Sequence, residues 1–258
     1  KPHQLLHFVR QVGQRRQQRG IDRREIQRLP VGAEAGHLAT EEVVRERALH
    51  DQAGGDVLLL QDRNEDGALD GEPRVVFARP GAHGLAIAQG HLYIATATDV
   101  YRAPIKADGT LGPEERIIND LPDGGQHPNR TLAFGPDGML YISVGSSCNA
   151  CNETNPEHAT LLRATPDGKT RSIFASGLRN TIGFAWDPAT GELWGMDHGI
   201  DYLGDDQQPE ELNRIGKGKQ YGWPHIWGTD GENPQSTPPG QISKKQWAAM
   251  SEPMVLGF

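Results

Sequence analysis

Residues 131–142 read TLAFGPDGMLYI, and this stretch decides the fold. An apolar run, a Pro-Asp-Gly turn and a second apolar run predict two short strands joined by a tight turn. The pattern returns in residues 84–94, GLAIAQGHLYI, and in residues 183–195, GFAWDPATGELWG, at spacings of 47 and 52 residues. A period near fifty with paired strands in every unit predicts a β-propeller, in which four-stranded sheets stack around an axis.

Other apolar segments supply the remaining strands of these units. They are residues 57–60, 74–77, 100–103, 116–118, 161–164 and 171–174. The 32 glycines and 18 prolines also suit short strands and many turns better than helices. We therefore expect an all-β fold with about three to four blades in residues 51–258.

Both ends of the chain differ from this pattern. Residues 1–50 contain one aromatic residue, Phe8, and no two-residue alternation, which predicts a helical or disordered leader outside the propeller. Residues 254–258 read like the beginning of another strand. Because a propeller must close its ring to hide its sheet edges, we expect a partial propeller that is truncated at the C-terminus.

The composition excludes some classes of partner. The formal net charge is −8, and residues 1–50 carry ten basic and six acidic residues, so the acidic excess lies in the predicted propeller. An acidic body argues against nucleic acid, because phosphate binding requires a basic face. The sequence contains no run of 18 or more apolar residues, so it predicts no membrane span. The chain begins with Lys1 and shows no signal segment, so we interpret it as mature or partial.

The two cysteines, Cys148 and Cys151, lie in the segment SCNACN. Their spacing favours a short-loop disulfide in an oxidising compartment, with free thiols or half of a metal site as the alternatives. A second Cys-x-x-Cys pair that would complete a zinc site is absent from the sequence.

Two polar features precede predicted inner strands one repeat apart. His127 stands in a Gly- and Pro-rich loop, and Arg179-Asn180 stand before the next inner strand. Propellers hold their sites at the mouth of the ring, so we expect these side chains to converge there. His127 would act as a general base, and the Arg-Asn pair would hold an anionic or carbonyl-bearing ligand. A surface histidine and a loop salt bridge are the simpler alternatives.

The acidic loop from Asp197 to Asp206, with Glu210 and Glu211 after it, is a third feature. Carboxylates and free backbone carbonyls around Gly199 are oxygen ligands of the kind that Ca²⁺ accepts. A solvated acidic loop is the alternative.

Residues 62–70, DRNEDGALD, resemble the first part of an EF-hand loop. The twelfth position is Pro73, which cannot supply the bidentate carboxylate of such a loop. A tight β-hairpin turn is therefore the favoured interpretation.

The motifs of the chain resemble those of the soluble quinoprotein glucose and sorbosone dehydrogenases, especially the aldose or L-sorbosone dehydrogenase branch. They are HPNRTLAFGPDGMLYISVG (127–145), GLRNTIGFAWDP (177–188), GELWGMDHGID (191–201), PEELNRI (209–215) and YGWP (221–224). The resemblance covers about residues 56–258. It implies a six-bladed propeller that binds pyrroloquinoline quinone (PQQ) and Ca²⁺ at one end. It also implies a periplasmic enzyme that oxidises an aldose or sorbosone-like sugar and passes electrons to an external acceptor.

The resemblance further implies roles for single residues. His127 matches the catalytic base, which takes the proton of the sugar hydroxyl as hydride passes to the quinone. Arg179 and Asn180 match residues that contact PQQ. Gln126 stands where glucose-oxidising members have an acidic residue, and Ala82-His83 where those members have a cofactor-contacting Gln.

The same resemblance implies two calcium sites. Gly199 and Ile200 match the backbone pair whose carbonyl oxygens hold the cofactor-side calcium. Glu211 and Tyr221 match ligands of a second, structural calcium, and Asp230 lies one residue out of step with a further ligand.

Two other functions fit a propeller. One is a non-catalytic propeller that binds carbohydrate or protein, and the other is a calcium-dependent propeller lactonase or other hydrolase. The presence of His127 with Arg179-Asn180 favours the dehydrogenase. A lactonase needs acidic ligands from several blades, whereas the acids here cluster in one.

Overall fold

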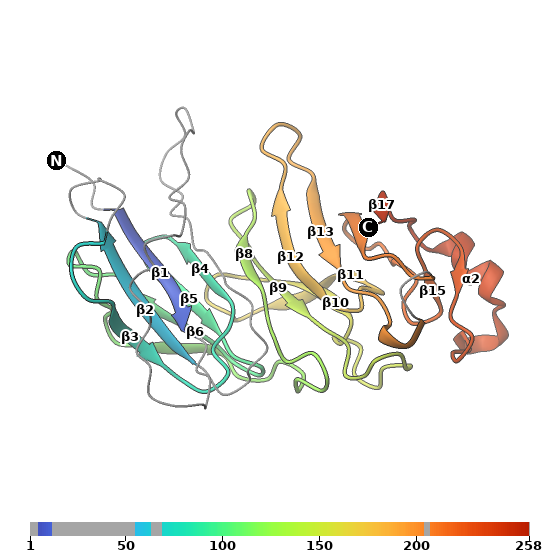
Figure 1. Cartoon of the computed structure of the whole chain (residues 1–258), viewed down its shortest axis with the longest axis horizontal. Coiled ribbons are helices and arrows are strands. Elements are labelled where there is room, and N and C mark those ends of the chain that lie inside the picture. Colours follow the sequence, from blue (N-terminus) through green and yellow to red (C-terminus); the bar gives the residue numbers. More distant parts are fainter. Residues whose placement is uncertain (1–4, 12–54, 63–68, 204–206, 258) are drawn as a thin grey trace.

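Antiparallel sheet makes up almost all of the regular structure (Figure 1). The computed structural model describes residues 5–11, 55–62, 69–203 and 207–257, the first of these ranges as a strand only. The strands are β1 (Leu5–Gln11), β2 (Asp56–Asp62), β3 (Arg74–Ala78), β4 (Leu85–Ala88), β5 (His91–Ala95), β6 (Val100–Pro104), β7 (Glu115–Ile118), β8 (Leu132–Phe134), β9 (Leu140–Val144), β10 (Thr160–Ala164), β11 (Arg171–Ser176), β12 (Thr181–Trp186), β13 (Leu193–Asp197), β14 (Glu211–Ile215), β15 (Ile226–Trp227), β16 (Gly231–Glu232) and β17 (Leu256–Gly257). The predicted all-β class is confirmed.

The repeat predicted from the sequence corresponds to three four-stranded sheets. Their strand orders are β4-β5-β6-β7, β8-β9-β10-β11 and β12-β13-β14-β17. In each, three or four consecutive strands form an antiparallel meander, which is the arrangement expected of a propeller blade. The strand expected near residues 254–258 is β17, which pairs with β14.

The segment Leu5–Gln11 differs from the prediction for residues 1–50. Helix or disorder was expected there, but the structure describes strand β1, which pairs antiparallel with β2 from Leu5↔Asp62 to Gln11↔Asp56. The reason is tertiary, because the backbone of β2 offers hydrogen bonds that a local sequence pattern does not reveal. Most of residues 1–50, and residues 63–68 of the predicted hairpin turn, lie outside the described residues.

The cores lie between one sheet and the next along the chain. The first joins β2 and β3 to the β4–β7 sheet through Val57, Leu59, Phe77, Leu85, Leu92, Ile94 and Tyr101. The second joins the β4–β7 and β8–β11 sheets through Tyr93, Val100, Ile118, Leu132, Leu140, Ile142 and Leu162. The third joins the β8–β11 and β12–β17 sheets through Tyr141, Leu161, Ala175, Leu178, Leu193, Ile215 and Tyr221. Each sheet therefore depends on its neighbours to cover its apolar faces.

Edge-to-face aromatic pairs reinforce these interfaces. The ring centroids of Tyr93 and Phe134 are 4.8 Å apart, as are those of Tyr141 and Trp186. Gly84 allows a close approach, because a Cβ there would lie 2.2 Å from the carbonyl oxygen of Arg130. Successive inner strands thus start side by side.

The segment after Tyr221 adds a small cap that the sequence reading did not predict. It contains the β15–β16 hairpin and helix α2 (Lys244–Met250), next to two 3-10 turns at Asp201–Leu203 and Pro239–Gln241. A capping box starts α2: the Ser243 hydroxyl accepts from the Gln246 amide, and the Gln246 side chain accepts from the Ser243 amide. Among the described residues, no helix is long and apolar enough to cross a membrane.

Candidate active site at one end of the sheets

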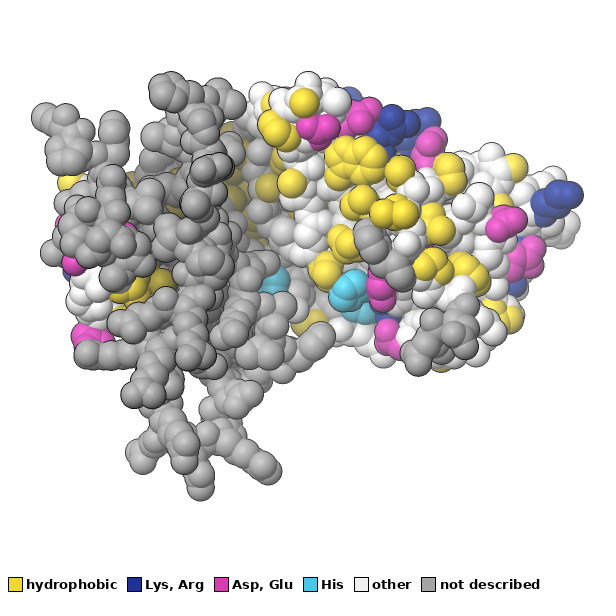
Figure 2. All heavy atoms as spheres, turned by 45° about the horizontal axis from the view of Figure 1, so that its top comes forward, with side chains coloured by type: hydrophobic (Ala, Val, Ile, Leu, Met, Phe, Trp, Pro, Cys, Tyr) yellow, Lys and Arg dark blue, Asp and Glu magenta, His cyan; other side chains and the backbone are white. Residues whose placement is uncertain are grey.

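Four loops meet at one end of the β8–β11 and β12–β17 sheets. They are the loop before β8, the β9–β10 loop, the segment before β12 and the β13–β14 loop, which share this end because neighbouring strands run in opposite directions. The Ser146 amide donates to the Arg179 carbonyl oxygen over 2.7 Å, which joins two of them directly. In the view of Figure 2, histidine and acidic side chains lie near one another below a group of hydrophobic side chains.

His127 is half-buried in the loop before β8. Its Nδ1 lies 2.7 Å from the carbonyl oxygen of Ser146. Because a carbonyl oxygen only accepts, Nδ1 carries the proton and Nε2 keeps its lone pair. Burial lowers the pKa of His127 below 6.5. The hydrogen bond to Ser146 opposes this shift, whereas the positive charge of Arg179 adds to it. The imidazole is therefore a neutral group with a basic nitrogen that no described residue engages.

Arg130 lies beneath this loop and was missed in the sequence reading. It is fully buried, and burial lowers its pKa to about 10. Its guanidinium donates to the carbonyl oxygens of Ala97 (3.0 Å), Pro122 (2.9 Å) and His127 (2.8 Å). The cation thus ties the His127 loop to the neighbouring sheet. Its place between a polar loop and an apolar strand was the only signal in the sequence.

Asn180 comes from the next sheet and lies next to His127. An added Cβ on Gly145 would stand 2.5 Å from the His127 Cβ and 3.1 Å from the Asn180 Oδ1, so both side chains border the same point. No described residue hydrogen-bonds the Asn180 side chain. The predicted convergence of His127 and Asn180 is therefore seen in this geometry, and Gly145 leaves the space that it requires.

Arg179 is also at this end, but it is buried. Its side chain is only 3% exposed. Nε donates to the Asn149 carbonyl (2.8 Å), Nη2 to the Asn149 Oδ1 (2.7 Å), and Nη1 to the His198 carbonyl (3.2 Å). The Asp201 Oδ2 lies 3.4 Å from the Arg179 Nη2, and the Asp201 side chain is largely exposed. Burial lowers the pKa of Arg179, although a guanidinium remains charged near neutral pH.

Asp197 fixes the backbone that presents these two residues. It is 5% exposed, and its carboxylate accepts from the amides of Arg179 (2.8 Å) and Asn180 (2.9 Å) and from the Thr181 hydroxyl (3.0 Å). Burial, together with the charge of Glu211 across the β13–β14 pair, raises its pKa to about 7. The sequence reading took Asp197 as part of an acidic loop, whereas it is the end of β13.

Gly199 and Ile200 follow β13, and side chains from the same loop hold their backbone. The Gly199 amide donates to the Glu210 carboxylate (2.8 Å), and the Ile200 amide donates to the Gln208 Oε1 (2.9 Å). The carbonyl oxygen of Gly199 accepts no hydrogen bond from the described residues. Residues 204–206 of the predicted acidic loop lie outside them.

Glu211 and Tyr221 both line a small cavity that also reaches Asp197 and Gly199, with room for about one water molecule (≈ 10 Å³). The Glu211 carboxylate is buried and accepts from the Gly228 amide over 2.6 Å. The Tyr221 hydroxyl donates to the Arg214 carbonyl (2.6 Å) and accepts from the Gly216 amide. Its hydroxyl is thus already engaged, which leaves only the backbone of Tyr221 as a source of a metal ligand.

The other residues singled out from the sequence are less involved. Asp230 is exposed before β16. Gln126 is exposed, and its backbone N–H donates to the Ser147 carbonyl oxygen. His83 is buried, with Nδ1 3.1 Å from the Arg130 carbonyl oxygen.

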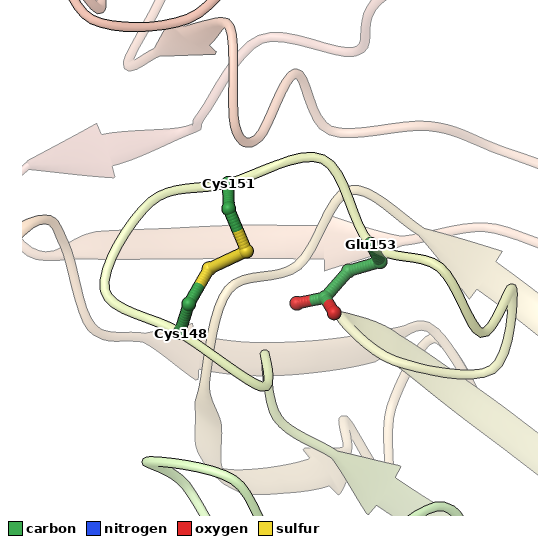
Figure 3. A group of neighbouring side chains, drawn as sticks. All are labelled: Cys148, Cys151 and Glu153. Carbon is green, nitrogen blue, oxygen red and sulfur yellow. A yellow bond between two sulfur atoms is a disulfide. The ribbon is translucent and has the colours of Figure 1, made fainter.

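Cys148 and Cys151 form the predicted disulfide, with an S–S distance of 1.96 Å (Figure 3). Glu153 lies beside it, but its carboxylate accepts from Ser146 Oγ (2.7 Å) and from the Ser147 amide (2.8 Å). Sulfurs bonded to each other are not thiolate ligands. This cluster is therefore structural rather than a metal centre.

Residues 86–256 match the family model described as glucose/sorbosone dehydrogenase. The chain belongs to the glucose/sorbosone dehydrogenase family. The match begins in β4 and ends in β17, so it contains the candidate site of this family member completely.

Named relatives agree with this assignment. This glucose/sorbosone dehydrogenase family member is 28% identical over 186 residues to a protein of Hypocrea jecorina named pyrroloquinoline quinone-dependent sugar dehydrogenase. The alignment covers 58% of this chain and 43% of that protein. It is also 30% identical over 120 residues to the aldose sugar dehydrogenase of Escherichia coli, covering 40% and 31%. The chain spans less than half of the length of the curated relatives that it matches.

Solved structures agree on the fold. The calcium structure of a Trichoderma reesei carbohydrate-active enzyme of family AA12 has a TM-score of 0.66 and 21% identity, and the alignment covers 80% of this chain and 63% of that one. The antiparallel sheets of the family member are thus blades of a β-propeller.

Proposed function

We propose that the protein is a PQQ-dependent dehydrogenase that oxidises an aldose or a sorbosone-like sugar, with His127 as the general base. The observation that carries the proposal is the pairing of His127 and Asn180, which come from consecutive blades and border one point at the same end of the sheets. Membership of the glucose/sorbosone dehydrogenase family supports it. So does the name of the Hypocrea jecorina relative, a PQQ-dependent sugar dehydrogenase.

His127 has the protonation state that this role requires. Its Nδ1–H is committed to the Ser146 carbonyl, so Nε2 is the nitrogen that would accept the proton of a sugar hydroxyl. The lowered pKa keeps the ring neutral before the reaction. Ser146 then stabilises the imidazolium, because its carbonyl oxygen accepts a stronger hydrogen bond from a charged donor.

Arg179 and Asn180 fit an anionic quinone cofactor in different ways. The Asn180 amide has unused donors and an unused acceptor, so we assign it the direct contact. Arg179 is almost inaccessible, so we assign it the role of a fixed positive charge that would stabilise negative charge on a bound quinone as it is reduced. When bound, PQQ would accept hydride from the sugar carbon, and Ca²⁺ beside it would polarise the accepting carbonyl.

Calcium fits the oxygen atoms available here. The carbonyl oxygens of Gly199 and Ile200 would hold the cofactor-side ion, since side chains from the loop already fix both backbone amides. The Glu211 carboxylate and the Tyr221 carbonyl would hold the structural ion beside the small cavity. A hard cation there would offset the repulsion between the buried carboxylates of Glu211 and Asp197.

The disulfide supports a periplasmic or secreted location, because such bonds persist in oxidising compartments. The same proposal includes a sugar substrate and an external electron acceptor. It also includes a six-bladed ring, of which residues 51–258 form a part.

The test is reduction of a dye by a panel of aldoses and sorbosone, with PQQ and Ca²⁺ added to the purified protein. We expect sugar-dependent reduction that requires both, and a loss of about 10²–10⁴-fold in kcat for His127→Ala. His91→Ala, which changes a histidine at the start of β5, is the matched control and should retain activity. An unchanged rate in His127→Ala would reject the assigned base. Failure of PQQ to bind or to support dye reduction would reject the cofactor.

A further inference from the structure

The β9–β10 loop belongs to the β8–β11 sheet and contacts the neighbouring sheet at the candidate site. We name residues 146–153 the cystine loop. The Ser146 carbonyl accepts from His127 Nδ1 over 2.7 Å, and the Ser146 amide donates to the Arg179 carbonyl over 2.7 Å. Ser146 therefore contacts both the His127 ring and the backbone of Arg179.

Asn149 makes the shortest contacts to the Arg179 guanidinium. Its carbonyl oxygen accepts from Nε over 2.8 Å, and its Oδ1 accepts from Nη2 over 2.7 Å. The same Oδ1 accepts from the Asp201 amide over 3.1 Å. Asn149 thus fixes the plane of the guanidinium with two acceptors. It also joins the guanidinium to Asp201 in the β13–β14 loop.

The cystine loop is closed around Asn149. The Cys148–Cys151 disulfide brackets it on both sides (Figure 3), which leaves this short segment few alternative conformations. At the base of the loop, Glu153 accepts from the Ser146 hydroxyl and from the amide and hydroxyl of Ser147 at 2.5–2.8 Å. The loop is therefore braced at two points, and Asn149 lies within the disulfide-closed part.

We propose that Asn149 is a positioning residue for Arg179 and that the Cys148–Cys151 disulfide serves to hold Asn149 in place. The functional value of this arrangement rests on the proposed role of Arg179 beside an anionic cofactor. A guanidinium is charged whatever its orientation, but its field and its remaining N–H groups are useful only in a fixed direction. A brace that served stability alone would not need its bracketed residue to bind Arg179 through two acceptors.

The first test measures Arg179 without any cofactor. In protein labelled with ¹⁵N-arginine, the Nε–H and Nη–H signals of Arg179 are identified by their loss in Arg179→Lys. Asn149→Ala removes the Oδ1 acceptor of Nη2, so we expect it to shift the Nη–H signals and to accelerate their exchange with solvent at least tenfold. Cys148→Ser/Cys151→Ser releases both acceptors of Asn149, so we expect it to have this effect on the Nε–H signal as well. Asn149→Asp keeps the acceptor oxygen and should retain the protected signal.

The matched control is Asn152→Ala, in the same loop, since the Asn152 side chain is exposed and contacts Thr237 instead. It should leave the Arg179 signal unchanged. An unchanged signal in Asn149→Ala would overturn the proposal. If the double serine variant lowers Tm but leaves Arg179 protected, the disulfide is a brace for the fold only and that half of the proposal is rejected.

The second test is PQQ affinity measured by equilibrium dialysis. We expect Kd to rise about tenfold in Asn149→Ala and to stay within twofold in Asn152→Ala. If the unaltered protein does not bind PQQ, the proposed function fails, while the Arg179 signal still decides whether Asn149 positions it. If PQQ binds and Asn149→Ala has normal affinity despite a displaced Arg179 signal, positioning by Asn149 is irrelevant to the cofactor.

Discussion

Replacing Arg130 with methionine should destabilise the protein severely. Methionine keeps the unbranched apolar stem but removes every donor from a site that is fully buried. Three backbone carbonyls, those of Ala97, Pro122 and His127, would each lose a hydrogen bond of 2.8–3.0 Å from a cation. At about 1–1.5 kcal/mol for each, the expected loss is about 4 kcal/mol in the free energy of unfolding.

Urea unfolding followed by tryptophan fluorescence provides the measurement. A fall in the midpoint without a change in slope corresponds to the loss of stability, and Tm should fall by about 8–16 °C. Arg116→Met is the matched control, since Arg116 is 54% exposed and its ion pair with Asp99 is 3.4 Å long. It should cost less than about 1 kcal/mol. Equal effects of the two substitutions would refute the reasoning that the buried guanidinium organises the His127 loop.

The remaining predictions concern pH, metal and space. Burial lowers the pKa of His225 to about 4, so the stability that its neutral ring contributes is present above pH 6.5 and is lost as the pH falls towards 4. His225→Phe should therefore flatten the dependence of unfolding free energy on pH in that range, as measured by urea titrations, and an unaltered slope would contradict this. Calcium at 100 times the Kd of the structural site should raise Tm by about 5–10 °C, and Glu211→Gln should abolish this contribution in a thermal melt with and without EGTA. Gly145→Ala should reduce kcat and PQQ affinity at least tenfold because its Cβ would displace His127, whereas Gly183→Ala, where an added Cβ meets nothing within 4 Å, should not. Wild-type kinetics in Gly145→Ala would show that the space beside His127 is not used.

The fold could be predicted because each strand of the repeat has a local signature. In residues 131–142, Gly138 has a positive φ of 71° in the turn between β8 and β9, which is the conformation that a Pro-Asp-Gly sequence supplies. Strand β1 had no such signature, because its pairing with β2 depends on a segment more than forty residues away. The S-x-x-Q signature at Ser243–Gln246 was present in the sequence, and it is the capping box of α2.

The position of polar groups beside predicted strands could be read from the sequence, as for His127 and Asn180, which the structure brings close together. The residues that were missed act through the backbone. Arg130 contacts carbonyl oxygens, and Asp197 and Asn149 contact the main chain or guanidinium of Arg179. A sequence shows which side chains could react, but not which of them fold back to hold a loop. Burial of Arg179 was equally invisible, because it depends on loops from two sheets.

The border between consecutive sheets gives the site a particular evolutionary freedom. The apolar faces of each repeat are constrained by both neighbours, so a substitution there has to be matched across an interface. The loops that begin the inner strands are held instead by single polar anchors, Arg130 in one repeat and Asp197 in the next. One repeat presents an imidazole where the next presents an amide. The polar group that each loop presents can therefore change while the packing between the sheets is kept, provided that the anchor of the loop is kept too.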